Sequence, residues 1–374
     1  MMKKLVMFAK HTLIVSNLLF LFSSCKKQEP IEWNAAISRP IFHPIEGPKV
    51  VYFYKGEEIS ATETLTDIGN FGWYFPVNSR TTGLTSLFPD SVAVEYGGLN
   101  TKLQMCTFKG GSKLSENTIK NLFNTCYIAH NKKNNFEYIT TGLAPGGRVC
   151  VWIDHIEIAR FKVNQIDVYF DKPVIIFEDS TEVYNYLKHH PINYSVWDKP
   201  DPLYELDFGF CSQNNNSTIN YIELISKEGL VNICFNRYIN KTDWNKPYNK
   251  DSNLILGIYY TTENIDVGYK SQLPVHLNIS YNFKNKEYST SVVLPDIFSK
   301  VYSAKKFNKI KEDYNRIIVG VENDGRHLII WIDGIAGQKK ILRCLSQEAI
   351  KVFDKNFQKN ITLNIKYATE VVYY

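Results

Sequence analysis

The sequence of 374 residues predicts an α+β fold in two tandem related units, each a mainly antiparallel sheet with one packed helix. Three observations predict this fold. Segments that alternate apolar and polar residues fill most of the chain, one segment in each half changes to a helical period, and the segments recur in the same order in both halves. The composition, with 44% hydrophobic and 22% charged residues, excludes a disordered or fibrous chain.

The N-terminal segment, residues 1–24, has the pattern of a secretory signal peptide. Lys3 and Lys4 precede the apolar run Thr12–Phe22, which is shorter than the roughly 20 apolar residues of a membrane-spanning helix. The following Ser23-Ser24-Cys25 resembles the lipoprotein box of bacteria, in which the cysteine is lipidated. A chance cysteine after an ordinary signal is the alternative. We expect acyl chains such as palmitate at Cys25 to hold the protein on a membrane, with residues 25–30 as a tether.

The first unit, residues 31–210, is expected to place one helix on its sheet. The segments Val92–Tyr96 and Leu99–Phe108 alternate, and Gly97-Gly98 between them is typical of a hairpin. Residues 114–126 carry apolar side chains with helical spacing, and Ser115 is in place to cap this helix. Three more strands follow, over Phe136–Gly142, Arg148–Ile153 and Ile156–Phe161.

The rest of the first unit adds a strand pair beginning at Ile166 and a second helix. That helix begins at Ser180 and has to end before Pro191, because proline disfavours helical geometry in the residue before it. The polar segment 211–218 (CSQNNNST) has no periodicity and is predicted to be the linker between the units.

The second unit, residues 219–374, is predicted to be a diverged repeat of the first. Phe88–Tyr96 matches Leu273–Tyr281, and Gly147–His155 matches Gly325–Gly334, at nearly the same offset. A weaker match joins Ile31–Trp33 to Ile219–Tyr221. The counterpart of the first helix is expected around Phe298, Val301 and Tyr302. In both units Asp or Asp-Gly between apolar runs predicts a hairpin.

A family resemblance rests on the opening EWNAAISRP (32–40), FPDSV (88–92), GLAPGGRVCVW (142–152) and SVWD (195–198). With these segments the chain resembles the bacterial lipoproteins of the domain-of-unknown-function 2931 family over about residues 31–210. The resemblance implies an exported lipoprotein and carries no catalytic residues. Some relatives are similar to immunity lipoproteins that are encoded beside secreted lipase toxins.

The sequence offers little that predicts an enzyme. It has no HExxH, GxSxG, Walker or GxGxxG motif, and His189-His190 at a helix end favour the helix dipole rather than a metal. Asp154 and Asp333 recur at hairpin turns, where aspartate is common for structural reasons. The six cysteines after Cys25 lack CxxC spacing and are expected to be mostly free, buried thiols.

Aromatic residues in Gly-, Asn- and Pro-rich loops are the candidate binding residues, because rigid rings give contact area at low entropic cost. These candidates are Trp73, Tyr74, Trp197 and Trp244. The same rings suit a carbohydrate platform, and small cores beneath long loops would explain them without any ligand.

We therefore expect a non-enzymatic outer-membrane lipoprotein, on the periplasmic or outer face, that binds another protein. A secreted lipase toxin that it neutralises in the envelope is the candidate partner, and a surface glycan-binding lipoprotein in nutrient uptake is the alternative. No metal or cofactor is expected. The net charge of +5 includes Lys3, Lys4 and Lys10 of the signal segment, and so small an excess argues against nucleic acid as a partner.

Overall fold

The computed structural model describes residues 31–63, 72–73, 80–81, 85–129, 136–153, 156–170, 180–201, 204–205, 207–212, 217–235, 270–295, 316–333, 339–354, 359–363 and 366–374. The predicted anchor at Cys25 therefore lies outside the described residues. Among those described, 63% lie in strands and 11% in helices. No described helix combines the length and apolar character needed to cross a membrane.

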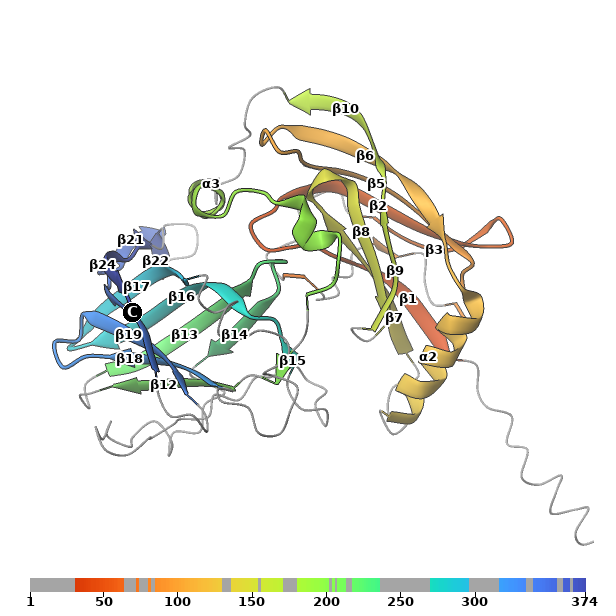
Figure 1. Ribbon diagram of the computed structural model, residues 1–374. Coiled ribbons are helices and arrows are strands. Elements are labelled where there is room, and N and C mark those ends of the chain that lie inside the picture. The colour runs from red at the N-terminus through yellow and green to blue at the C-terminus, as the bar shows by residue number, and fades with distance from the viewer. Residues whose placement is uncertain are drawn as a thin grey trace, which may run out of the picture.

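The first unit is a β-sandwich of two sheets that face each other (Figure 1). The first sheet has the order β1 (Glu32–Ser38), β7 (Phe136–Ala144), β8 (Arg148–Ile153) and β9 (Ile156–Lys162). The second has the order β10 (Asn164–Phe170), β6 (Met105–Lys113), β5 (Ser91–Leu99), β2 (Ile45–Tyr54), β3 (Glu57–Glu63) and β4 (Arg80–Thr81). Alternate residues of both sheets, such as Val151 and Val94, form one buried core between them.

The second unit is also a sandwich. One sheet has the order β12 (Asp207–Ser212), β18 (Arg316–Val321), β19 (His327–Asp333), β20 (Lys339–Leu345) and β24 (Thr369–Tyr373). The other has the order β14 (Val231–Phe235), β13 (Ser217–Ser226), β16 (Pro274–Phe283), β17 (Lys286–Val293) and β23 (Lys366–Tyr367). Two short pairs complete the described strands: β11 (Tyr204–Glu205) with β15 (Lys270–Ser271), and β21 (Ile350–Asp354) with β22 (Lys359–Leu363).

The two sandwiches share one topology, which supports the predicted duplication. β1 runs parallel to β7, as β12 does to β18, and antiparallel strands follow in both sheets. The facing sheets also correspond, because β6-β5-β2-β3 has the same order as β17-β16-β13-β14. The match of Ile31–Trp33 to Ile219–Tyr221 does not fit this order, since β12 rather than β13 is the counterpart of β1. The predicted linker, 211–218, carries the end of β12 and the start of β13, so the chain enters the second sandwich before Asp207.

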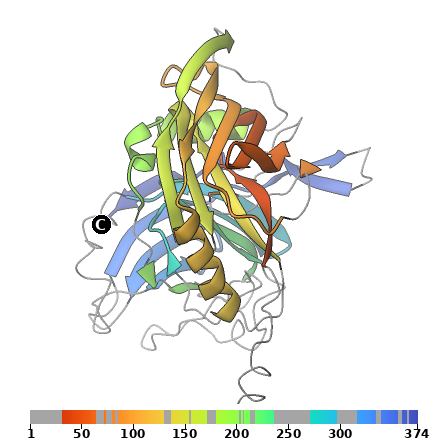
Figure 2. The same cartoon turned by 90° about the vertical axis from the view of Figure 1, so that its right-hand side faces the viewer.

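The predicted α+β class is wrong, because the face of the sheet that we assigned to a helix is covered by a second sheet. The helix α2 (Glu116–Ala129) does form, with Thr118 N–H donating to the Ser115 hydroxyl at 3.3 Å, and it buries Ile119 and Phe123 in the core. It lies at one end of the first sandwich (Figure 2) and does not form a layer. Its expected counterpart around Phe298, Val301 and Tyr302 lies outside the described residues.

Of the other local predictions, three strands and a helix are confirmed and one turn is wrong. The strands predicted over 136–142, 148–153 and 156–161 are β7, β8 and β9, and the helix predicted from Ser180 is α3 (Ser180–His189). The hairpin turn predicted at Gly97-Gly98 is wrong. β5 continues through both glycines, and the chain turns at Asn100, whose side-chain oxygen accepts the N–H groups of Lys102 and Gln104.

Candidate functional site

The two sandwiches lie side by side (Figure 1), and two buried clusters contain residues of both; this contact region is called here the junction. The second sandwich contributes the β13–β14 turn, residues 226–230. Its Gly229 carbonyl accepts the N–H of Ile41 at 3.2 Å and that of Trp73 at 2.9 Å, both from the first unit. Gly229 has a φ of +83°, and a Cβ there would lie 2.5 Å from Cβ of Pro40, so only glycine fits the contact.

The GLAPGGR segment forms the β7–β8 turn at the edge of this junction. Pro145–Gly147 make a short 3-10 turn, η1, with Gly146 at φ +67° and Gly147 at φ +78°. A Cβ on Gly146 would lie 2.5 Å from the ring of Tyr194, which belongs to the 3-10 turn η2 (Tyr194–Trp197). Glycine suits both positions because φ is positive and neighbouring atoms leave no room for a Cβ.

Arg148 joins this turn to the SVWD segment. Its Nε donates to the Asp198 carboxylate at 2.9 Å, its Nη1 donates to the Gly146 carbonyl at 2.9 Å, and its guanidinium lies over the Tyr194 ring at 4.4 Å. Two of the segments that carry the resemblance, 142–152 and 195–198, are far apart along the chain and meet here. Their chemistry here is that of packing and hydrogen bonding.

A group of polar side chains, of which Glu228 and Gln272 are buried, crosses the junction next to this cluster. Arg160 of β9 donates to the Trp197 carbonyl at 2.6 Å and pairs with Glu157, also at 2.6 Å. Glu228 of the β13–β14 turn lies 3.8 Å from Arg160 and accepts a hydrogen bond from Gln272. Burial raises the pKa of Glu228 to about 7, although the bond from Gln272 and the charge of Arg160 oppose the shift.

Trp73 and Trp197 lie inside the junction in a small buried cluster, which fits the alternative of small cores beneath long loops and not an exposed binding surface. Trp73 is fully buried and packs edge-on against Trp152 with ring centroids 4.8 Å apart. Trp197 is 1% exposed, and its Nε1 donates to the Glu228 carbonyl at 3.1 Å. A loop aromatic looks the same in sequence whether solvent or a second domain covers it. Tyr74 and Trp244, the other two predicted binding residues, lie outside the described residues.

A second cluster, called here the imidazole cluster, was not predicted. It contains His43 from the β1–β2 loop, His190 after α3, and His276 of β16, all around the ring of Tyr186 in α3. Three elements far apart in sequence contribute one histidine each, so no spacing could have indicated it. The expectation that His190 serves a helix dipole missed its contact with His276, where the two ring nitrogens are 3.2 Å apart.

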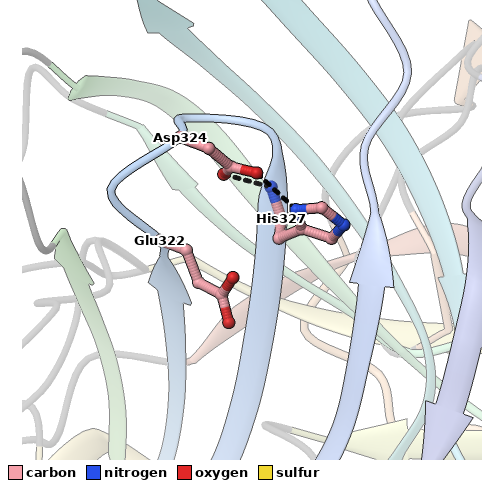
Figure 3. A group of neighbouring side chains, drawn as sticks. All are labelled: Glu322, Asp324 and His327. Atoms are coloured by element: carbon pink, nitrogen blue, oxygen red, sulfur yellow. Dashed lines mark hydrogen bonds and ion pairs between the residues drawn. The ribbon is translucent and has the colours of Figure 1, made fainter.

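A third group, Glu322, Asp324 and His327, has the residue types of a metal site and lies at the β18–β19 turn (Figure 3). Each member is already engaged. Asp324 accepts the N–H groups of Arg326 and His327 and contacts the His327 ring, while Glu322 pairs with Arg343 through two bonds of 2.9 and 2.7 Å. That pairing lowers the pKa of Glu322. The hairpin and the ion pair account for this group without a metal.

The described thiols of Cys106, Cys150 and Cys344 are free and buried, as predicted for them. Burial raises the pKa of each, to about 12 for Cys344, which disfavours the reactive thiolate.

The comparisons with known proteins add one finding. Residues 23–195 match a family model described as "protein of unknown function (DUF2931)". The match covers the first sandwich together with α3, while β12 and the rest of the second sandwich lie outside it. No curated protein and no solved structure matches the chain.

Proposed function

We propose, from the premise that residues 23–195 belong to the DUF2931 family of proteins of unknown function, that this chain is a lipid-anchored, non-enzymatic binding protein of the outer membrane. Its partner is another protein, for which a secreted lipase toxin that it neutralises is the working candidate. Support for the anchor comes from the basic start, short apolar run and Cys25 of the sequence.

The observation that carries the proposal is strand β24 (Thr369–Tyr373). Among the described strands it pairs with β20 alone, so its other edge offers unpaired backbone groups. Its side chains are exposed, with Val372 at 48% and Tyr373 at 52%. Proteins usually protect such an edge with charges, prolines or bulges. β24 carries one charge, Glu370, at an irregularity in its pairing with β20, and the uncharged residues Val371, Val372 and Tyr373 follow it.

The partner that fits this edge is an extended segment of another polypeptide. Such a segment adds a strand to the sheet through main-chain hydrogen bonds, while its side chains meet Val372 and its neighbours. Lys339 and Lys340 lie on the adjoining strand β20, with the Lys340 ammonium over the Tyr374 ring at 4.5 Å. This positive charge beside the apolar edge favours a partner strand with acidic residues.

The non-enzymatic part of the proposal is supported by the state of the reactive groups. The described thiols are buried, and the carboxylates Glu157, Glu228 and Glu322 are engaged by Arg or Gln side chains. A catalytic nucleophile or base needs an accessible position and a pKa suited to its task.

The glycan-binding alternative, like the protein-binding expectation, used the loop aromatics as its candidate surface. Because Trp73 and Trp197 are buried in the junction, they provide no platform for a sugar ring or for a protein. We retain the protein partner as the proposal because the exposed edge of β24 does not depend on these aromatics.

The test compares two matched surface variants of the full chain in mild detergent. Val372→Glu places a carboxylate on the β24 edge, and Ile166→Glu does the same on β10, the edge strand of the first sandwich, where Ile166 is 63% exposed. Binding to a purified secreted lipase toxin is measured by calorimetry, and protection of a susceptible strain is measured in parallel. We expect Val372→Glu to weaken binding at least tenfold and abolish protection, with Ile166→Glu unchanged. Equal binding by both variants would exclude β24, and no protection by the unmodified chain would exclude immunity.

A further inference from the structure

The imidazole cluster is a buried contact between three separate elements. His43 comes from the first sandwich, His190 from the segment after α3, and His276 from the second sandwich. Tyr186 of α3 lies among them, with its ring 4.5 Å from that of His190, 5.3 Å from that of His276 and 6.1 Å from that of His43. His43 and His276 are buried, and His190 is half-buried.

The hydrogen bonds of Asn278 determine the protonation of this cluster at neutral pH. The Asn278 amide donates to the Glu223 carboxylate at 3.0 Å, so its oxygen faces His276 and accepts from His276 Nε2 at 3.0 Å. His276 Nδ1 is then the unprotonated nitrogen. It accepts a hydrogen bond from the protonated Nε2 of His190 at 3.2 Å. One hydrogen bond between two neutral rings thus joins the α3 segment to the second sandwich.

The charges around the cluster do not favour a protonated imidazole. The Arg39 guanidinium donates to the His43 carbonyl at 3.2 Å, and His189 packs beside Tyr367 next to His276. Glu223 is the carboxylate of this network, and Asn278 stands between it and His276. A proton added to the cluster therefore gains no direct carboxylate partner from these groups.

We propose that the imidazole cluster makes the junction acid-sensitive, so that protonation of His43, His190 and His276 loosens α3 and separates the two sandwiches. A proton on His276 Nδ1 turns the acceptor of the His190 bond into a second donor and places a charge in a buried site. The cost is relieved when the junction opens and water reaches the rings.

The direction of the pH effect follows from the pKa values. Burial lowers the pKa of His43 and of His190 to about 4 and that of His276 to about 3, from an ordinary value of 6.5. Between pH 6.5 and 4 an opened junction binds more protons than a closed one, so acid favours opening. From pH 7.5 to 5 each histidine that becomes solvated shifts the opening equilibrium roughly 30-fold.

Glu228, on the other side of the junction, opposes this effect. Its pKa is raised to about 7 when buried, so between pH 7 and its ordinary value of 4.5 the closed junction holds the extra proton. Lys227 pairs with Asp201, whose pKa burial also raises, next to Glu228. Burial also raises the pKa of Glu223, but Glu223 pairs with Asn278 between β13 and β16, inside the second sandwich, so opening of the junction leaves that contact in place. Acid thus stabilises the side of the junction with the two carboxyl groups and destabilises the side with three histidines, and the larger number of histidines sets the net sign.

The test is hydrogen exchange by mass spectrometry on the full chain in mild detergent at pH 7.5 and 5, corrected for the intrinsic rate. We expect α3 and the 226–230 turn to exchange at least tenfold faster at pH 5, while β5 and β16 inside the two cores keep their protection. His190→Gln is the milder variant because His190 is half-buried, and His276→Gln is the stronger one. Each should reduce the acid response at least tenfold.

His327→Gln, which changes a histidine outside the junction, is the matched control and should leave the response unchanged. Glu228→Gln should enlarge it, because the opposing group no longer titrates. Equal exchange of α3 at both pH values, or an unchanged acid response in both histidine variants, would overturn the proposal. Simultaneous loss of protection in β5 and β16 would also overturn it, because acid would then unfold the molecule as a whole.

Discussion

The β7–β8 turn of the first sandwich and the β18–β19 turn of the second hold the same place in one topology, yet they have different surroundings. Each is held by a tyrosine of the facing sheet: the Tyr96 hydroxyl donates to the Ala144 carbonyl at 2.7 Å, and the Tyr281 hydroxyl to the Gly325 carbonyl at 3.1 Å. The first turn is buried beneath Tyr194 and the junction. The second has Asn323 and Asp324 exposed to solvent.

This difference explains where the family resemblance lies. At the first turn Gly146 leaves room for the Tyr194 ring of η2, and Arg148 donates a hydrogen bond to Asp198. At the second turn Gly325 also has a positive φ and a close aromatic ring, but that ring is Phe283 of the same sandwich, and Asp324 there makes the backbone hydrogen bonds of an ordinary hairpin. The most specific segment of the sequence therefore marks the surface on which the junction is built, and the repeat lost it where no such surface is needed.

The largest expected effect compares two tryptophans at equivalent positions. Trp152 of β8 is buried against Trp73 in the junction, whereas Trp331 of β19 is half-buried. Trp152→Ala should lower the free energy of unfolding by about 3–5 kcal/mol, and Trp331→Ala by about 1–2 kcal/mol. Urea unfolding of both variants measures this. Equal losses would show that the junction adds nothing to the stability of the first sandwich.

A smaller effect is expected at the turn itself. Gly146→Ala combines a positive φ with a contact to the Tyr194 ring and should cost about 1–3 kcal/mol. Gly56→Ala is the control, since φ there is +84° but no atom lies within 4 Å of the added Cβ, so only backbone strain of about 1 kcal/mol is expected. Thermal unfolding compares the two, and identical shifts would mean that Tyr194 yields freely.

The ion pairs beside the two turns sharpen the contrast. Asp198→Asn leaves the largely buried Arg148 with a weaker partner and should cost about 1–2 kcal/mol. Glu322→Gln weakens a pair whose arginine, Arg343, is more accessible to water than Arg148, so about 0.5–1 kcal/mol is expected. Unfolding of both variants in low and high salt tests whether salt screens the Glu322 pair more than the Asp198 pair. A larger salt effect for the Asp198 pair than for the Glu322 pair would contradict it.

The smallest expected difference concerns the two tyrosines. The Tyr96 hydroxyl also lies 3.3 Å from the Arg148 carbonyl, and the Tyr281 hydroxyl lies 2.6 Å from the Ser346 hydroxyl. Tyr96→Phe and Tyr281→Phe therefore each remove two hydroxyl contacts, one of them to a turn carbonyl, and should each cost about 1 kcal/mol. This equality checks that the two turns are held in the same way. If Tyr96→Phe alone were costly, the shared tyrosine would be a feature of the covered turn only.

Much of the local structure followed from the sequence. Alternation located β7, β8 and β9, helical spacing with Ser115 located α2, and the matched segments paired Tyr96 with Tyr281 and Trp152 with Trp331. These signals are local, because the side-chain period and the capping residue belong to the same few residues that form the element. The prediction of a turn at Gly97-Gly98 is wrong because glycine also occurs within strands where other side chains come close. Here the side chains of Tyr169 and Glu46 lie against Gly97.

The sequence by itself indicated most of the described strands, the main helix, the repeat and the match of residues 23–195 to a family model, together with the expectation of an anchor at Cys25. Only the tertiary structure decided that the strands form two facing sheets, that Trp73 and Trp197 lie inside a junction, and that three distant histidines meet around Tyr186. The physical reason is that an apolar face in the sequence specifies burial but not the surface that buries it. That surface is chosen when whole sheets pack together.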